Sequence, residues 1–522
     1  SGGLEIQGPI SGAGAVTFGT TAAATSFGGI VALTGNSNGY GINTYTGGST
    51  FNTARVQIGG DTLYSGPATS PTILSGPFGT GAMTWTSGEG TSGFSLEAIG
   101  GPRTIVNAFN ATSSDADISV RFMGHEALSF TRNWDMHNGV TLRNRTLAVN
   151  NSNQPITFSG NLSNSGVQGS NLVKTGVGLL VLTGTNTQAN LLNTNGNYGT
   201  GVFIDSGILR VNADAALGST AALAAAMSHL AGPADVRLRG GYLSVSNSFT
   251  TARQFILTAA SGIDVASGQT LTLSTQTAGA FGITKTGPGT LALNNSANTI
   301  TSLTLGGQQQ LNPNVGYYSH TGGTVSTTAT SGTPFGSFPT LALAAGATNV
   351  GSTIVTVTAT AGLLPGMAVS GAGIPAGAVV ASVTNGTTFV LSLPATANAT
   401  GLSLNTYGNA AINSGTLALV GGGTAQALSI PALVYGAAGA ISLNQGTTTS
   451  SLTVASLFGR ANPFNVAAYG TLSINPSALA NLGSTEKLLV TTGAPANTTL
   501  GAGTTLTTPS IFVALAGSGQ NA

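Results

Sequence analysis

The chain has 522 residues, of which 5% are charged and 78 are glycine, and its formal net charge is +1. An average globular protein carries roughly a quarter charged residues. A charge this close to zero attracts neither nucleic acid nor an anionic membrane surface, so we expect neither as a partner. The chain has no cysteine, which excludes disulfides and thiol chemistry.

The rest of the composition indicates a folded β protein. The glycines follow no three-residue period, which excludes collagen, and the positive mean hydropathy of +0.28 argues against disorder. No run of 18 apolar residues is present, so we expect no membrane-spanning helix. The chain starts without Met or a basic leader, and we interpret it as processed or as part of something longer. A cysteine-free β chain fits an exported bacterial protein.

The first 150 residues hold 14 of the 27 charges. Short alternating runs begin here with "VALTGNSN" at 31–38, read as a strand, a turn and an Asn. "RFMGHEALSFTRNWDMH" at 121–137 is the densest polar cluster. Its members His125, Glu126, Asp135 and His137 are imidazole and carboxylate groups that can bind metal. Their spacing matches no metalloprotease motif, so we predict a solvated strand here and no cofactor.

Two other groups in the chain have a binding interpretation. Asp115 and Asp117 in "SSDADIS" offer oxygen ligands for calcium, but they lack the repeated glycine-rich loop of calcium-binding solenoids, and a polar turn is favoured. Aromatic side chains can stack on sugars. The aromatic candidates are Trp85, Trp134, Tyr317 and Tyr318, but isolated exposed aromatic residues are common and need no function.

The centre of the chain repeats itself. "NLVKTGVGLLVLTGTNTQ" at 171–188 returns as "GITKTGPGTLALNNSANT" at 282–299, and two of the three lysines, Lys174 and Lys285, take the same place in both. We expect Leu-x-Leu to point inward, Gly-x-Gly to form a corner, and Asn to bond its own backbone or an Asn of the next coil. We expect both lysines at a solvent-exposed edge, where Lys285→Thr would change stability little.

Further strands are predicted between and after the two copies. They are "VFI" at 202–204, "ILRVNA" at 208–213, "TLTLST" at 270–275 and "TLALVG" at 416–421. The alanine-rich segment 214–232 is the one candidate for a helix or a few turns. Irregular spacing between the repeats favours a solenoid over a closed barrel.

Residues 345–404 break this pattern with a Gly-Pro turn and an Asn-Gly hairpin. They resemble small all-β modules of phage structural proteins and bacterial surface proteins. We therefore predict three segments: a solenoid at 1–338, an inserted β-sandwich or barrel-like domain at 339–407, and a resumed solenoid at 408–522.

The repeat also resembles a known family. Residues 172–218 carry Leu-x-Lys-x-Gly-x-Gly, Leu-x-Leu, Gly-x-Asn, Tyr-x-Gly, Gly-x-Leu and a closing "ADAALG". This order resembles the autotransporter-associated β-strand repeat of bacterial passenger domains, although the copy at 282–299 lacks Tyr-x-Gly and the stretch at 27–66 lacks the lysine. The resemblance implies a right-handed parallel β-helix, secretion and display on the surface of a bacterium. It implies no reaction.

Three functions compete on these grounds. The first is a structural extracellular protein that self-associates head to tail into a fibre, sheath or matrix. We expect apolar edge strands to make that contact, through Leu4 and Ile6 at one end and Ile511, Phe512, Val513 and Leu515 at the other. The second is an adhesin passenger domain binding a glycan or surface ligand. The third is a carbohydrate-active enzyme, but the acids beyond residue 150 are widely separated, so we predict that the chain is not an enzyme.

Overall fold

A computed structural model describes most of the chain. The described residues are 3–19, 29–67, 70–85, 94–111, 117–136, 143–151, 154–165, 170–186, 201–218, 235–279, 281–306, 322–338, 340–361, 363, 367–375, 378, 380–408, 410–421, 424–443, 448–459, 461–462, 465–469, 471–490 and 511–513. Within them the protein is all-β, with no α-helix and two short 3-10 helices, η1 (Asp214–Leu217) and η2 (Leu479–Asn481). The chain divides into two compact units. The first comprises Ser1–Phe249, Arg253–Ile256 and Gln310–Tyr317, and the second comprises the remaining residues.

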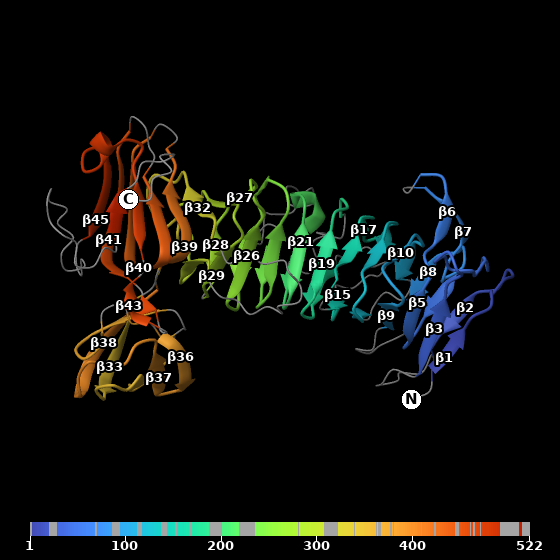
Figure 1. Ribbon diagram of the computed structural model, residues 1–522, viewed down its shortest axis with the longest axis horizontal. Helices are drawn as coiled ribbons and strands as arrows, with labels where there is room; N and C mark the ends of the chain where they lie inside the picture. The colour runs from blue at the N-terminus through green and yellow to red at the C-terminus, as the bar shows by residue number, and fades with distance from the viewer. Residues whose placement is uncertain are drawn as a thin grey trace, which may run out of the picture. The chain divides into compact units, whose positions relative to one another are not determined.

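The first unit contains three parallel sheets (Figure 1). Its first sheet contains β1 (Gly3–Ile6), β3 (Ile30–Thr34), β5 (Arg55–Gly59), β9 (Phe94–Ala98), β12 (Ile118–Met123), β15 (Arg143–Val149), β18 (Ser170–Thr175), β20 (Gly201–Ile204) and β22 (Asp235–Leu238). The second contains β10 (Arg103–Ile105), β13 (Leu128–Phe130), β16 (Ile156–Phe158), β19 (Leu179–Leu182), β21 (Ile208–Val211) and β23 (Tyr242–Val245). The third contains β2 (Val16–Phe18), β4 (Ser49–Phe51), β8 (Met83–Trp85), β11 (Phe109–Ala111), β14 (Trp134–Asp135) and β17 (Leu162–Ser163). A small antiparallel hairpin joins β6 (Leu63–Ser65) to β7 (Thr72–Ser75).

From β8 to β19 the chain visits the three sheets in turn, so each strand lies beside the strand three places earlier. The register places inward-facing residues opposite one another: Val120 pairs with Leu147, and Leu147 pairs with Lys174. Since parallel strands cannot be joined by a tight hairpin, each return to the same sheet needs a longer crossover. Here the crossover consists of strands of the other two sheets.

Alternation along these short strands fills the space between the sheets with large side chains. Phe51 stacks on Phe18 and on Phe94, with ring centroids 5.3 and 4.6 Å apart. Trp134 stacks on Phe109 at 4.5 Å. All five rings are at most 3% exposed. The core of the first unit is therefore an aromatic column inside stacked strands.

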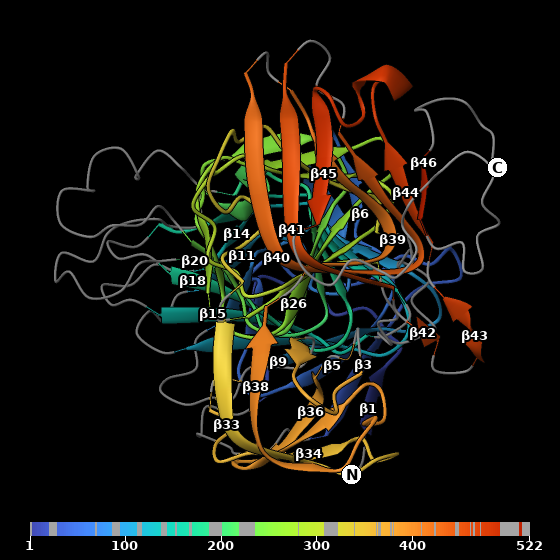
Figure 2. The ribbon, with the colours of Figure 1, turned by 90° about the vertical axis from the view of Figure 1, so that its left-hand side faces the viewer.

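The second unit is also built from stacked parallel strands, and the side chains in its core are smaller. Its parallel strands are β26 (Ser261–Val265), β27 (Thr270–Leu273), β29 (Ile283–Thr286), β30 (Thr290–Leu293), β31 (Leu303–Leu305), β32 (Thr324–Thr327), β39 (Ala410–Leu419), β40 (Gln426–Ser442), β41 (Ser450–Gly459), β44 (Leu472–Asn475), β45 (Glu486–Val490) and β46 (Ile511–Val513). Strands β39 and β40 are long enough to join two rows: β31 pairs with the start of β39, and β32 with its end. Figure 2 shows the long strands β39, β40 and β41 side by side.

Short strands complete the inventory. They are β24 (Phe249–Thr251) and β25 (Phe255–Leu257) near the boundary between the units, β28 (Thr277–Gly279), and the antiparallel pair β42 (Ala461–Asn462) and β43 (Asn465–Tyr469).

A separate antiparallel sheet occupies the chain between β32 and β39. Its order is β35 (Ala368–Ser370), β38 (Ala399–Tyr407), β33 (Thr340–Thr348), β34 (Ile354–Thr356), β37 (Thr388–Leu391) and β36 (Val380–Asn385). It has a core of its own, which includes Val355, Phe389 and Leu404, none of them exposed. The first and last strands of this sheet along the chain, β33 and β38, are neighbours and pair Thr340 with Tyr407, so the chain leaves and re-enters the parallel strands at adjacent points.

The predicted all-β class is confirmed, and the large parallel sheets are compatible with a β-helix or solenoid. The predicted helical segment 214–232 begins with η1, a single 3-10 turn, and its residues from 219 onward lie outside the described part.

Candidate functional site

Lys174 lies inside the first unit, on the inward face of β18. Its neighbours in register are Leu147 on β15 and Ile204 on β20, and all three side chains are fully buried. The lysine stem therefore fills a place in a row of aliphatic side chains.

The ammonium of Lys174 is satisfied by backbone. Nζ donates to the carbonyl oxygens of Thr175 at 2.8 Å, Gly176 at 2.7 Å and Ser206 at 3.0 Å. Thr175 is the last residue of β18 and Gly176 is the first residue of the turn after it, whereas Ser206 belongs to the turn that follows β20. Because a primary ammonium has three N–H donors, its capacity is filled, and it links two neighbouring turns.

Lys285 repeats this arrangement in the second unit. It lies on β29 between Ile263 and Leu305, and all three side chains are fully buried. Nζ donates to the carbonyl oxygens of Thr286 at 2.6 Å, Gly287 at 2.8 Å and Gly322 at 3.4 Å. The repeat thus encodes the same site twice.

The prediction that both lysines are solvent-exposed is wrong. Leu172 and Lys174 are two residues apart on β18, as are Ile283 and Lys285 on β29, so alternation places each lysine on the inward face. The cost of burying the charge is offset by hydrogen bonds to turn carbonyls. The Lys-x-Gly spacing supports this geometry, because Gly176 and Gly287 turn with φ of 76° and 77°.

Burial makes both amines weak bases. Desolvation lowers the pKa of Lys174 to about 7 and that of Lys285 to about 8. The negative charges of Asp205 and Asp264, respectively, oppose these changes in pKa.

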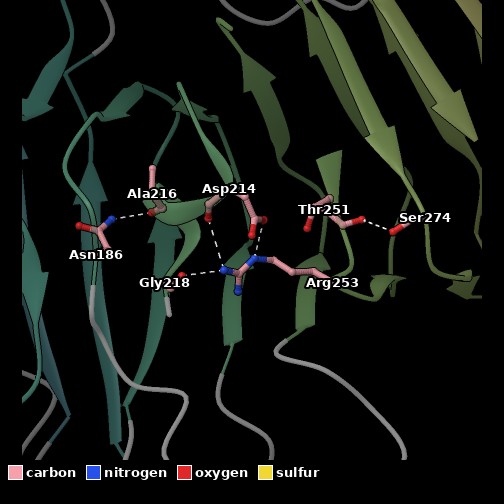
Figure 3. Close-up of polar contacts among 7 residues, drawn as sticks. All are labelled: Asn186, Asp214, Ala216, Gly218, Thr251, Arg253 and Ser274. Carbon is pink, nitrogen blue, oxygen red and sulfur yellow. Dashed lines mark hydrogen bonds and ion pairs between the residues drawn. The ribbon is translucent and has the colours of Figure 1, made fainter. Parts of the chain in front are cut away.

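The "ADAALG" close of the repeat forms a third buried cation site (Figure 3). Arg253 is 1% exposed; its Nε donates to the Asp214 carboxylate at 2.8 Å, and Nη2 donates to the Gly218 carbonyl at 2.6 Å. Asp214 begins η1 and Gly218 follows it with φ of 108°. The motif therefore forms a turn whose carboxylate and carbonyl clamp an arginine.

Asparagines at the corners bridge neighbouring strands through backbone groups. Asn186 accepts from the Leu162 amide at 2.8 Å and donates to the Ala216 carbonyl. Asn298, its counterpart in the second repeat, accepts from the Thr277 amide at 2.7 Å and donates to the Pro334 carbonyl at 2.6 Å. We expected bonds to their own backbone or to another Asn. The Asn298 amide also donates to the nearby Asn295 carbonyl at 3.3 Å, as expected in part, whereas the other partners are backbone groups before and after the asparagines in the stack.

A side-chain ladder occurs elsewhere, along the starts of β12, β15 and β18. The Asn171 amide donates to Asn144 at 3.0 Å, and the Asn144 amide donates to the Asp117 carboxylate at 3.2 Å. The backbone N–H of Asn144 also donates to Asp117, at 2.8 Å. The candidate calcium ligand Asp117 is thus an acceptor in a polar ladder, and Asp115 lies outside the described residues.

The predicted polar cluster is not brought together as a metal site. His125 and Glu126 lie in a bend between β12 and β13, not on a strand as predicted, because the strand ends at Met123 before Gly124 turns with φ of 84°. Asp135 lies on β14 and accepts from the backbone amide and hydroxyl of Ser165. His137 lies outside the described part. Among the described residues no group of three or more His, Cys, Asp or Glu could hold a metal ion.

The two tryptophans are not sugar platforms. Trp85 and Trp134 are fully buried, and Trp134 belongs to the aromatic column of the first unit, because each tryptophan lies at an inward position of its strand. Tyr317 and Tyr318 lie outside the described residues.

The predicted self-association residues lie on two sheet-edge strands. Leu4 on β1 is 59% exposed and Ile6 is partly exposed, and β1 is the first strand of its sheet. Ile511, Phe512 and Val513 form β46, which pairs in parallel with β44 and is the last strand of its sheet. Leu515 lies outside the described residues.

Comparison of the chain with protein-family models, curated proteins and solved structures found no match. No helix in the described part is long and apolar enough to cross a membrane.

The geometry defines a set of buried polar sites, each of which connects one turn between strands to the next.

Proposed function

We propose that this chain is a structural extracellular protein, a right-handed parallel β-helix of the autotransporter-repeat type, whose copies associate into a surface fibre, sheath or matrix. The observation that carries the proposal is the structural role of the two repeated lysines, Lys174 and Lys285. Both ammonium groups bond to backbone carbonyls of two successive turns and are fully buried. The amine of each repeat thus holds successive turns of the chain together. This is a role that a scaffold protein requires.

The cyclic visits of the chain to three parallel sheets support the β-helix, and the resemblance of residues 172–218 to the passenger-domain repeat supports its right-handedness and its secretion from a bacterium. The edge strands β1 and β46 support self-association, because each presents a backbone edge at which the described residues place no further strand. Copies joined edge to edge, head to tail, form an open filament.

Electron microscopy of the purified chain tests this proposal. We expect filaments, and we expect removal of residues 508–522 to abolish them while leaving the folded body intact by circular dichroism. A protein that stays monomeric at high concentration would overturn the proposal. Unchanged filaments after the deletion would overturn the role of β46.

An adhesin passenger domain is the second candidate. One observation favours it: Tyr40 and Tyr64 are each 37% exposed, and Tyr40 is bridged to Asp61, three residues before Tyr64. Exposed aromatic rings bind sugars by stacking. A glycan screen of the chain and of a Tyr40→Ala/Tyr64→Ala variant tests this function, which requires binding that the variant loses.

A further inference from the structure

One row of strands in the second unit carries a regular, uncharged outer face. The strands are β27, β30, β32, the end of β39, the end of β40, and β44, all paired in parallel. Their apolar residues, such as Leu291 and Leu417, are fully buried on the inner face. The alternate residues form the outer face, and the chain from 286 to 459 contains no Asp, Glu, Lys or Arg.

The outer face consists of two rows of small residues in register. The first row is Thr270, Thr290, Thr324, Thr416, Ala440 and Ser473. The second row is Thr272, Ala292, Ser326, Ala418, Ser442 and Asn475. We call this surface the threonine face.

The two rows differ in height on the three middle strands, β30, β32 and the end of β39. There the threonines of the first row are partly exposed, whereas Ala292 and Ala418 are 7% exposed and Ser326 is 8% exposed. The remaining members of the second row, Thr272, Ser442 and Asn475, are partly exposed. The middle of the threonine face is therefore a ridge beside a shallow trough that is closed at both ends. Two copies related by a twofold axis present the same ridge and trough to each other, so each ridge fits the other's trough, as in an isologous contact.

The spacing between neighbouring strands indicates which partner can pack on the threonine face. Neighbouring strands are about 4.8 Å apart, and side chains of two surfaces interdigitate over several strands only when both have that repeat, as between paired β-sheets. A charged polymer or an ionic membrane surface finds no charged partner on this face. A second copy of the chain has the same repeat, no charge and matching hydroxyl and methyl groups.

We infer that the threonine faces of two copies pack against each other and join neighbouring filaments side by side. This inference rests on the proposed self-association and adds the lateral partner to it. Six strands span about 29 Å, which gives about 300 Å² per copy for a face two side chains wide. A stable interface needs about 800 Å² per partner. A single contact is thus weak, and it becomes effective when filaments present many copies at once.

Disulfide trapping tests the contact, because the chain has no cysteine of its own. Thr324→Cys places one thiol in the middle of the threonine face. Thr304→Cys on β31 is the matched control, since Thr304 is also an outward, partly exposed threonine on a parallel strand of the same unit. Under mild oxidation of the assembled full-length protein we expect covalent dimers of Thr324→Cys to form at least tenfold faster than those of Thr304→Cys. Equal rates would overturn the inference.

A second pair of variants separates this inference from the proposed function. Thr324→Lys should leave single filaments that no longer associate laterally in micrographs, whereas Thr304→Lys should behave like the unaltered chain. If filaments form but Thr324→Cys does not cross-link faster than Thr304→Cys, only the lateral contact is overturned. If Thr324→Cys dimers form rapidly but no filaments form, the fibre proposal is overturned and the pairing of threonine faces is supported. If Thr324→Cys unfolds at a lower temperature than the unaltered chain, Thr416→Cys in the same row replaces it, with the same expectation.

Discussion

A buried ammonium group is costly unless all of its donors find acceptors. At Lys174 and Lys285 the acceptors are turn carbonyls, which are fixed by the backbone and need no further side chain. The third acceptor comes from a different turn, that of Ser206 or Gly322. Each lysine therefore contributes to stability by joining two turns that are distant in sequence.

Lys285→Met should destabilise the protein by about 1–3 kcal/mol, because an apolar side chain of similar length leaves the carbonyls of Thr286, Gly287 and Gly322 without their donor. Chemical denaturation measures the loss. The same substitution at Lys487, which is partly exposed on β45, should cost less than about 0.5 kcal/mol. Similar losses at the two positions would show that the carbonyl cradle contributes little.

The lowered pKa values of Lys174 and Lys285 predict how stability depends on pH. Below about pH 7 these lysines are protonated in the folded and the unfolded chain, and folding bears the full cost of burying both charges. As the pH rises from 7 towards the ordinary value of 10.5, the folded lysines lose their protons first, so the free energy of unfolding increases. The slope is at most about 1.4 kcal/mol per pH unit for each lysine.

Denaturation at pH 6.5, 7.5, 8.5 and 9.5 measures this slope, with the double variant Lys174→Met/Lys285→Met as the reference. The difference between the two proteins should shift in favour of the unaltered chain as the pH rises. A shift in the opposite direction would mean that the hydrogen bonds of the charged form outweigh its desolvation.

At the scale of an element, the turn η1 depends on Arg253, which comes 35 residues after Gly218, the residue that follows the turn. Arg253 Nη2 reaches the Gly218 carbonyl, and its Nε reaches Asp214 at the start of η1. The arginine thereby fixes both ends of the turn.

Arg253→Met should unfold this turn locally and cost about 3–5 kcal/mol, because it leaves a partly buried carboxylate without its cation. Arg239→Met is the matched control: Arg239 also pairs with an aspartate, Asp205, but its side chain is 36% exposed, so the loss should stay below about 1 kcal/mol. Hydrogen exchange of the amides of residues 208–218 resolves the two cases. Equal protection in both variants would contradict the clamp.

The sequence predicts the strands of this protein well, because period-two alternation and Gly or Asn turns are local signals. Thus 208–213 and 270–275 contain β21 and β27. Lys174 was misplaced because the charge was given more weight than its spacing from Leu172, which puts both on one face. His125 and Glu126 were misplaced because Gly124 ends the strand before them.

Other features could not be read from local pattern. The clamp between Asp214 and Arg253 depends on which turns become neighbours, and so do the acceptors from Ser206 and Gly322. The threonine face has the same origin: Thr290, Thr324 and Thr416 come from segments of different length, and only the register of β30, β32 and β39 brings them into line.

For the molecule as a whole, the distribution of charge has a consequence for assembly. The charges concentrate in the first 150 residues, whereas the second unit contains most of the uncharged run from 286 to 459. The contacts proposed for β46 and for the threonine face would therefore involve backbone hydrogen bonds, hydroxyls and methyl groups, not ion pairs. Such contacts are insensitive to screening, since at ~1 M salt the Debye length falls to about 3 Å while apolar burial is unaffected or strengthened.

We therefore expect both the assemblies and their lateral association to persist when NaCl is raised from 0.05 to ~1 M. Turbidity and negative-stain micrographs across this range measure both effects. The Thr324→Lys variant provides the contrast, because its lysines repel each other across paired faces at low salt and less so at high salt, so its bundles should return in part as salt rises. Filaments of the unaltered chain that dissolve at ~1 M salt would show that ion pairs hold the copies together, and the charged first 150 residues would then be the place to seek the contact.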